Sequence, residues 1–484
     1  MAAPPPVLHA PNTSNLNAPS ISGFLRTGVL PQNFPPTTIV DLGHALASTQ
    51  ACADACVAWS NASEPLARCR SFTRVSEAYP VGNLTGWCLG HLDPVWLPVT
   101  APQLDSGVVQ WPCRSDDDCS LNGVCSADAT CECSSGWKGR RCETLDLLPI
   151  DPAKLGFSPM DADTGERLSS WGGTVWADET DAGKWHMFAA RMRHSCGIDS
   201  WLTNSMIVHA VSADPLGPFV EERVVWDTFA HEPCVARSPN GSWVMVGVHA
   251  PATTPTYNAS SVCNCTTVCT QHGNCSRCDA AAHPIEPFVA FAPSLDGPWV
   301  AQDAAGLSDG DSNLAVWIAR SSGAVYGLTR GGSGGRMAAD WRDVSSWAPC
   351  AEGRDCSIVG QPDAEDPMVW QDEATGHWHA ILHNLEGPHM VHGQLASVGI
   401  HIFSRDGDHW TNGGTAYTNH VVFTDGTSLL LNRRERPHVV FARGTTVPIA
   451  LSNSVEPGGE PGEGGWVPTG GDLTFTLVQA VRRS

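Results

Sequence analysis

The stretch "AEDPMVWQDEATGHWHAILHNLEGPHM", residues 364–390, joins a polar start, a short apolar run, a polar turn and a second apolar run. Two apolar runs separated by a turn are typical of antiparallel β-strands. The stretch opens with two adjacent carboxylates, Glu365 and Asp366, directly before a proline. This acid pair is either part of a functional site or the solvated start of a strand, and the rest of the chain bears on the choice.

The opening of this stretch has four counterparts elsewhere in the chain. The five segments are "GGTVW" (172–176), "EPCVA" (232–236), "NLAVW" (313–317), "DPMVW" (366–370) and "RPHVV" (436–440). Each is followed by a second apolar run after a polar turn, and several by a third that ends in a turn such as "SLDGPW". Spacings of roughly 55 to 80 residues suit four-stranded sheets with variable loops. We therefore predict a mainly β chain with a five-bladed β-propeller over residues 155–484.

Composition limits the partners of this 484-residue chain. It carries 28 Lys and Arg against 50 Asp and Glu, a formal net charge of −22. This charge argues against nucleic acid and anionic membrane surfaces as partners. No apolar stretch is long enough to span a membrane, so we expect no membrane insertion.

Cysteines and glycosylation motifs indicate an extracellular or secretory-lumen protein. There are 19 cysteines, mostly at short spacings, as in secreted disulfide-built modules. Seven Asn-x-Ser/Thr motifs predict a glycoprotein, at Asn12, Asn61, Asn83, Asn240, Asn258, Asn264 and Asn274. The start, "MAAPPPVLHAPNTSNLNAP", shows neither the basic nor the apolar segment of a signal peptide, which disagrees with that location.

Small modules are expected before the propeller. Residues 1–40 are rich in Pro, Asn and Ser and predict a flexible segment. In residues 41–112, a helical pattern with Cys52 and Cys56 precedes two strand-like runs that carry Cys69 and Cys88. This arrangement resembles a PAN/apple domain, and an unrelated disulfide-linked domain is the alternative.

Residues 113–145 have a more specific pattern. Six cysteines follow the spacing C-x5-C-x5-C-x5-C-x-C-x8-C, with Gly136, Trp137 and Gly139 in the last loop. This segment resembles an EGF-like module, and a zinc knuckle is the less favoured alternative. The resemblance implies the disulfides Cys113–Cys125, Cys119–Cys131 and Cys133–Cys142. The acidic lead of calcium-binding EGF modules is absent, so we expect no calcium.

The repeated strand opening, with "S-x-D-G-x-x-W" turns at the blade edge, resembles the five-bladed glycoside hydrolases of families 43, 32 and 62. The resemblance implies that acidic residues opening the innermost strands converge at one end of the central channel. Hydrolysis of a glycosidic bond needs one protonated and one ionised carboxyl group. Because neighbours on one strand usually point apart, we expect Asp366 to face the channel, Glu365 to point away, and the partner to come from another blade.

Alignment of the repeats gives the candidate site. One ring contains Gly172, Glu232, Asn313, Asp366 and Arg436, and the residues just before them are Trp171, His231, Ser312, Glu365 and Glu435. Asp366 and Glu232 are the carboxylates we expect to be catalytic. Arg436 is a candidate for orienting a carboxylate or binding an acidic sugar, Asn313 for bonding hydroxyls, and Trp171 for stacking on a sugar.

Two departures from the resemblance bear on activity. Family 43 enzymes have their base Asp on the first blade, where this chain has Gly172, and Asn313 replaces a third-blade Asp. Their general acid often lies in a Glu-Gly-Pro element, and "LEGPH" makes Glu386 a third catalytic candidate, with a chance match as the alternative. Asp366 is therefore either a working residue or the remnant of one.

Further residues are weaker candidates. His231, His383 and Asp199 are possible substrate-binding residues, although a hydrogen-bonded role without catalysis is favoured. The Cys-rich insert 257–283 suggests zinc or disulfides, and its glycosylation motifs favour disulfides. Cys196 is a candidate partner for Cys234. We expect no metal and no cofactor.

Two functions remain open. The first is a secreted glycoside hydrolase that acts on a polysaccharide or glycan. The second is a non-catalytic extracellular protein that binds glycans or, through its apple-like and EGF-like modules, another protein. The missing first-blade Asp favours the second function.

Overall fold

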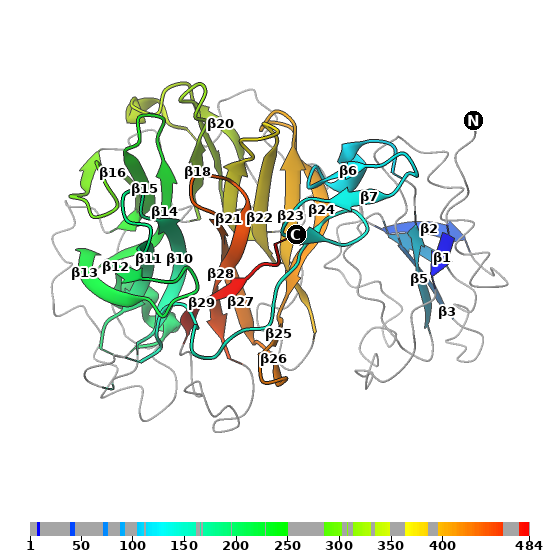
Figure 1. Ribbon diagram of the computed structural model, residues 1–484, viewed down its shortest axis with the longest axis horizontal. Helices are drawn as coiled ribbons and strands as arrows, with labels where there is room; N and C mark the ends of the chain where they lie inside the picture. Colours follow the sequence, from blue (N-terminus) through cyan, green and yellow to red (C-terminus); the bar gives the residue numbers. More distant parts are fainter. Residues whose placement is uncertain are drawn as a thin grey trace. The chain divides into compact units, whose positions relative to one another are not determined.

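The computed structural model describes residues 113–160, 165, 168–194, 196–227, 229–249, 285–302, 307, 313–330, 334–348, 364–385, 395–457 and 474–483, with the backbone of five N-terminal strands (Figure 1). The chain divides into two compact units. The first consists mainly of residues 1–133 and the second mainly of residues 144–484. Within the described part, no helix has the length and apolar character needed to cross a membrane.

The N-terminal strands form one sheet in the order β1-β5-β3-β4-β2. They are β1 (Val7–His9), β2 (Ile39–Gly43), β3 (Ser71–Val75), β4 (Cys88–His91) and β5 (Leu104–Gln110). β3 and β4 coincide with the two predicted cysteine-bearing runs. β1 lies in the segment expected to be flexible and pairs with β5. The predicted helix lies outside the described residues, and the apple-like assignment stays a prediction.

The EGF-like module consists of a 3-10 helix (Asp116–Cys119) and two short strands, β6 (Gly123–Cys125) and β7 (Cys131–Cys133). The three implied disulfides are present: Cys113–Cys125, Cys119–Cys131 and Cys133–Cys142. They replace the core that a segment of this length cannot bury.

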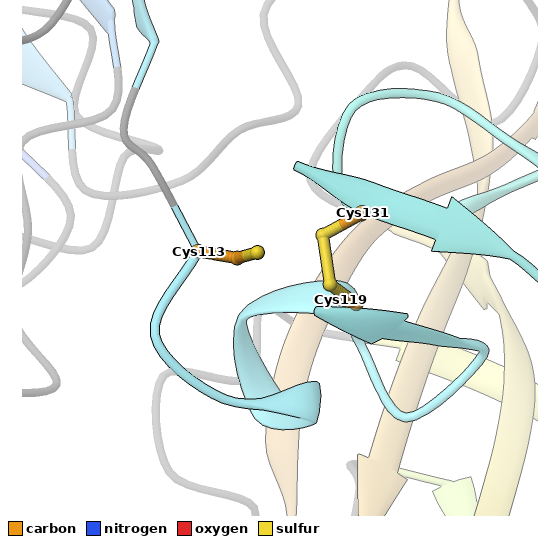
Figure 2. A group of neighbouring side chains, drawn as sticks. All are labelled: Cys113, Cys119 and Cys131. Carbon is orange, nitrogen blue, oxygen red and sulfur yellow. A yellow bond between two sulfur atoms is a disulfide. The ribbon is translucent and has the colours of Figure 1, made fainter. Parts of the chain in front are cut away.

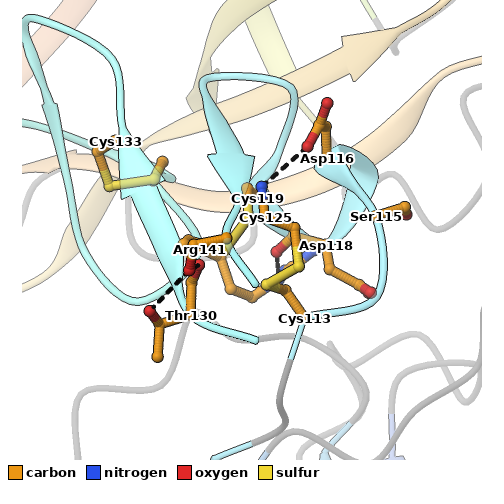
Figure 3. Close-up of a disulfide and its surroundings, with 12 residues drawn as sticks. Cys113, Ser115, Asp116, Asp118, Cys119, Cys125, Thr130, Cys133 and Arg141 are labelled. Carbon is orange, nitrogen blue, oxygen red and sulfur yellow. Dashed lines mark hydrogen bonds between the residues drawn. A yellow bond between two sulfur atoms is a disulfide. The ribbon is translucent and has the colours of Figure 1, made fainter. Parts of the chain in front are cut away.

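Two aspartates organise the first loop of this module (Figure 3). The backbone N–H of Cys125 donates to Asp116 Oδ1 at 2.8 Å, and that of Arg114 donates to Asp118 Oδ2 at 2.8 Å. These bonds hold the 3-10 helix against β6. The acidic residues of the loop therefore satisfy backbone donors within the module.

Figure 2 shows three neighbouring cysteines, Cys113, Cys119 and Cys131, whose bonding decides whether this module is a zinc knuckle. Cys119 is bonded to Cys131, and Cys113 is bonded to Cys125. Zinc binds thiolates, and a sulfur in a disulfide is no longer a thiolate. The disulfides therefore exclude a zinc knuckle here.

The second unit contains five successive antiparallel sheets. The first has β10 (Ser170–Ala177), β11 (Trp185–Met192), β12 (Ser205–Ser212) and β13 (Val220–Trp226); the second has β14 (Ala230–Arg237), β15 (Trp243–His249), β16 (Glu286–Ala292) and β17 (Val300–Gln302); the third has β18 (Ala315–Ile318), β19 (Val325–Leu328) and β20 (Gly334–Ala338); the fourth has β21 (Ala364–Gln371), β22 (Trp378–Asn384), β23 (Ser397–Ser404) and β24 (Thr411–Thr418); the fifth has β27 (Arg433–Phe441), β28 (Pro448–Glu456) and β29 (Phe475–Ala480).

Short elements complete the unit: the strand pairs β8 (Trp137–Lys138) with β9 (Thr144–Leu145) and β25 (His420–Val422) with β26 (Ser428–Leu430), the 3-10 turns Ile198–Ser200 and Val344–Ser346, and the helical turn α2 (Trp201–Asn204).

The innermost strands close a ring. β10 contacts β14, β14 contacts β18, β18 contacts β21, β21 contacts β27, and β27 contacts β10 (Figure 1). Apolar side chains fill the space between neighbouring sheets; Phe188, Val235 and Phe288, for example, belong to one cluster between the first and second sheets. The prediction of a mainly β, five-bladed propeller is confirmed, and each predicted first and second strand lies in its own blade.

Candidate active site at the start of the innermost strands

The backbone at the ring positions is unusual and repeats from blade to blade. Gly172, Glu232, Asp366 and Arg436 have φ angles of 70°, 63°, 53° and 48°, in the left-handed region. At each of them the pairing with the second strand shifts, so that two residues oppose one, as in a β-bulge. For a residue other than glycine this conformation costs about 1–3 kcal/mol. The same bulge therefore recurs at the equivalent position of four blades.

Arg436 links the ring residues of three other blades. Its Nη2 atom contacts Glu232 Oε1, lies 3.0 Å from Asp366 Oδ1, and donates to Asn313 Oδ1 at 2.5 Å. All four side chains are buried or nearly so. The side chains of Glu232, Asn313, Asp366 and Arg436 therefore lie together in the structure, as the alignment of the repeats predicted.

Gly172 lies beside this arrangement. A Cβ atom at Gly172 would stand 3.5 Å from Arg436 Cδ. Gly172, the ring position of the first blade, is thus next to Arg436 and carries no side chain. In this chain the carboxylates around Arg436 come from the second and fourth blades.

A second group of acids adjoins the first. Ligand atoms of Glu365, Asp366, His383 and Glu435 all lie within 4.8 Å of one another, and all four residues are buried. His383 Nδ1 lies 3.2 Å from Glu365 Oε1, and Arg330 Nη1 lies 3.3 Å from Glu365 Oε2.

The expectation that Glu365 points away from Asp366 is therefore wrong. Alternation of neighbouring side chains assumes a regular extended strand. The left-handed backbone at Asp366 and the bulge there break the alternation. Both carboxyl groups consequently reach the same cluster.

The acids of the cluster differ in their affinity for protons. Burial raises the pKa of Glu435 to about 7, and the nearby Asp366 carboxylate adds to the rise. Burial also raises the pKa of Asp366, while the Arg436 guanidinium opposes that rise. For Glu365, burial acts upward, but the hydrogen bond from His383 brings the pKa below its usual value. The cluster thus holds Glu435, which is half protonated near neutral pH, beside Glu365, whose ionised form is favoured.

The pKa values of His231 and His383 are shifted in opposite directions. Burial and the Arg436 charge hold the pKa of His231 far below its usual value, so its ring is neutral. Its Nδ1 lies 2.6 Å from Ser205 Oγ, and its ring packs on Trp201. For His383, burial acts downward, but Glu365 and Glu435 raise its pKa. His231 is a packed, hydrogen-bonded residue, whereas His383 belongs to the acid cluster.

Other predicted residues lie elsewhere or are not described. Trp171 is 5% exposed and packs against Ala190 and Ile198 in an apolar cluster. The backbone of Asp199 is in the 3-10 turn Ile198–Ser200, and its side chain lies outside the described residues. Glu386 and the insert 257–283 also lie outside them. The roles proposed for these residues stay predictions.

The proposed Cys196–Cys234 disulfide is wrong. Among the described residues, Cys234 has a free, buried thiol, while Cys196 is bonded in a disulfide. Cys234 follows the bulge of β14 and lines the channel with Val316 and Val235. Its side chain thus points into the channel, where burial raises the pKa of the thiol to about 11.

Two groups in the described part of the propeller have donor atoms suited to a cation. The carboxylates of the acid cluster are hard ligands of the kind that Ca²⁺ prefers. In the other group, His186 Nδ1 lies 2.8 Å from His209 Nε2, and Asp296 Oδ1 lies 3.0 Å from Lys184 Nζ. Those donor atoms already have partners within the protein.

Glu365 and Glu435 are the functional candidates that sequence reasoning missed. Both stand directly before a bulged residue that is followed by proline, in "EDP" and "ERP". The shared Glu-x-Pro pattern is the signal that could have paired them.

One family model matches part of the chain. Residues 115–144 match the family model "Teneurin-like EGF domain", which supports the EGF-like module. No curated protein matches the sequence.

The solved structures that align with this chain include glycoside hydrolases. The catalytic domain of a GH62 α-L-arabinofuranosidase from Coprinopsis cinerea aligns at 12% identity and a TM-score of 0.41, covering 69% of this chain and 98% of that one. A putative exo-β-1,3-galactanase from Bifidobacterium bifidum aligns at 12% and 0.38, covering 68% and 94%. A GH43 enzyme from Xanthomonas citri, complexed with xylose, aligns at 11% and 0.39, covering 70% and 90%.

Proposed function

We propose that this protein is an extracellular glycoside hydrolase that acts on a glycan or polysaccharide at the acid cluster. The observation that carries the proposal is the pairing of Glu435 with Asp366. Glu435 has a pKa of about 7, and the nearest ligand atoms of the two side chains lie within 4.8 Å. A proton donor beside a carboxylate is the combination that glycoside hydrolysis requires.

The two carboxyl groups have distinct roles. Glu435, buried and protonated up to near neutral pH, donates its proton to the glycosidic oxygen as the bond to the anomeric carbon breaks. Asp366, ion-paired with Arg436, supplies the negative charge that stabilises the oxocarbenium-like state. Arg436 also contacts Glu232 and Asn313, and so sets the position of groups from three blades.

We propose that Asp366 attacks the anomeric carbon directly. Retaining enzymes have carboxyl groups about 5–5.5 Å apart, whereas inverting enzymes leave about 6.5–9.5 Å for a water molecule. One oxygen atom of each group lies within 4.8 Å of the other, a bound that the retaining arrangement satisfies. Water then releases the sugar with its anomeric configuration retained.

The extracellular location is supported by the EGF-like module. Its three disulfides persist only in an oxidising compartment. Modules of this kind also bind other proteins, and we include an extracellular protein partner in the proposal. The net charge of −22 supports an uncharged glycan over a polyanion as the substrate.

A second candidate function is glycan binding without hydrolysis. Arg436 is ion-paired with both Glu232 and Asp366, and Gly172 provides no carboxylate beside it. In that function the same polar groups bond sugar hydroxyls but catalyse no reaction.

A screen of aryl glycosides and cell-wall polysaccharides separates the two functions. We expect the native protein to release sugar, and Asp366→Asn and Glu435→Gln to reduce kcat by about a hundredfold or more. Glu286→Gln, at an exposed position of β16, is the matched control and should keep the native rate. Retention on a glycan array without turnover would favour the second function.

A further inference from the structure

A cavity of about 330 Å³ lies at the opposite end of the propeller channel from the acid cluster. The innermost strands that begin at the acid cluster end here, β10 at Ala177, β14 at Arg237 and β27 at Phe441. The cavity, which we call the arginine cavity, is lined by Trp176, Ala177, Glu179, Arg237, Trp243, Arg320 and residues 441–445.

Aromatic side chains separate the arginine cavity from the acid cluster. The rings of Trp176 and Trp317 lie 6.1 Å apart, and Phe441 packs on both at 6.4 and 6.1 Å. Trp370 packs on Phe441 at 5.8 Å. The channel above this layer retains a void of only about 10 Å³. A ligand in the arginine cavity therefore does not reach the acid cluster.

The last position of the five repeated segments explains why the arginine cavity is not filled by a side chain. The last position of the repeated segment is Trp176, Trp317 and Trp370 in the first, third and fourth blades, but Ala236 in the second. The small side chain leaves room beside Trp243, whose ring packs edge-on against Trp176. The lining of the cavity is thus partly aromatic.

Three arginines from three blades line the cavity. Arg237 is ion-paired with Glu179, and Arg320 Nε lies 2.6 Å from Glu373 Oε1. Arg443 Nη2 instead donates to two backbone carbonyls, those of Asp181 at 3.0 Å and residue 182 at 3.1 Å. Among the described residues, no carboxylate forms an ion pair with Arg443.

The cavity therefore has an uncompensated positive charge in a chain whose net charge is −22. In addition, Arg237 Nε is buried and has no hydrogen-bond partner in the described structure. Guanidinium groups pair with planar or tetrahedral oxyanions through two parallel hydrogen bonds. Aromatic rings such as Trp176 offer a face for an apolar or sugar ring.

We propose that the arginine cavity binds a small ring compound that carries a carboxylate or sulfate group, such as an acidic or sulfated monosaccharide. The volume is at the lower end of the range of about 300–1,000 Å³ found for ligand pockets, which suits one or two rings. Arg443 and Arg237 bind the oxyanion, and Trp176 contacts the ring. This site is independent of the proposed hydrolase activity.

Isothermal titration calorimetry of the full chain tests the proposal with galacturonate, galactose 6-sulfate and neutral galactose. We expect at least one anionic sugar to bind at least about tenfold more tightly than galactose, since one charge-assisted pair contributes about that factor. Binding of galacturonate alone identifies a carboxylate ligand, binding of galactose 6-sulfate alone a sulfate ligand, and binding of both a general oxyanion site. Equal affinities for all three, or no binding, would overturn the proposal.

Variants assign the binding to this cavity. Arg443→Gln should weaken binding of the anionic sugar at least about tenfold, and Arg443→Lys should weaken it less because the charge remains. Arg342→Gln, at an exposed arginine outside the cavity, is the matched control. Asp366→Asn should leave the affinity unchanged, which separates this site from the acid cluster. Native affinity in a folded Arg443→Gln variant, checked by circular dichroism, would contradict the assignment.

Discussion

Replacement of Glu435 by glutamine tests the electrostatics of the acid cluster through stability alone, without a substrate. The side chain is 8% exposed, and burial raises its pKa from 4.5 to about 7. Glutamine keeps the size and polarity of the protonated acid but cannot ionise. The difference in unfolding free energy between Glu435→Gln and native protein therefore reports the cost of ionising Glu435 in the folded state.

The sign of the effect follows from proton binding. Between pH 4.5 and about 7, the folded protein holds the Glu435 proton and the unfolded chain has released it. Stability contributed by the protonated carboxyl is thus complete at acidic pH and is lost as pH rises through this window. A rise in the pKa of Glu435 from 4.5 to about 7 corresponds to about 3 kcal/mol. Glu435→Gln should gain about 3 kcal/mol relative to native protein between pH 4 and pH 8.

Urea unfolding of the propeller, followed by tryptophan fluorescence at several pH values, provides the measurement. Groups that titrate equally in both proteins cancel in the difference. Glu286→Gln, at an exposed position, is the control and should show no such gain. A relative gain below about 1 kcal/mol for Glu435→Gln would refute the raised pKa of Glu435, because the shift and the energy are the same quantity.

Three further predictions follow from contacts in the structure. Arg436→Gln should destabilise the propeller by about 3–5 kcal/mol, since it leaves buried carboxylates unpaired, and a urea midpoint equal to the native one would contradict those ion pairs. The double variant Cys119→Ser, Cys131→Ser should destabilise the EGF-like module by about 2–5 kcal/mol while the propeller transition stays unchanged, which calorimetry can resolve. Proton NMR of the first product of hydrolysis should show retained anomeric configuration, and an inverted product would exclude direct attack by Asp366.

Much of the fold could be predicted from sequence because strand patterns are local. The five segments ending in "VW", "VA" or "VV" each became the innermost strand of a blade. The EGF-like disulfides followed from the resemblance to EGF-like modules that the cysteine pattern carries. The Cys196–Cys234 pair failed because such a pairing depends on how two blades face each other, and the bulge in β14 turns Cys234 into the channel.

Only part of the candidate site could be predicted, because its geometry depends on backbone conformation as well as on the repeats. Alignment of the repeats placed Glu232, Asn313, Asp366 and Arg436 in one ring, and their side chains lie together in the structure. It did not reveal that Asp366 has a left-handed backbone, since a positive φ angle at a residue other than glycine leaves no clear mark in composition. That one angle brings Glu365 into the cluster, and the equivalent bulge in β27 accompanies the approach of Glu435.

The pH dependence of kcat/KM on a hydrolysed glycan, compared between native protein and Glu435→Gln, tests the central claim most directly. In the proposed mechanism protonated Glu435 is the active form, so the native rate should fall about tenfold per pH unit above pH 7. The variant should be at least about a hundredfold slower below pH 7, and its rate should not show the fall above pH 7. A native-like rate and profile in folded Glu435→Gln would contradict the pairing of Glu435 with Asp366 as the catalytic acid and carboxylate.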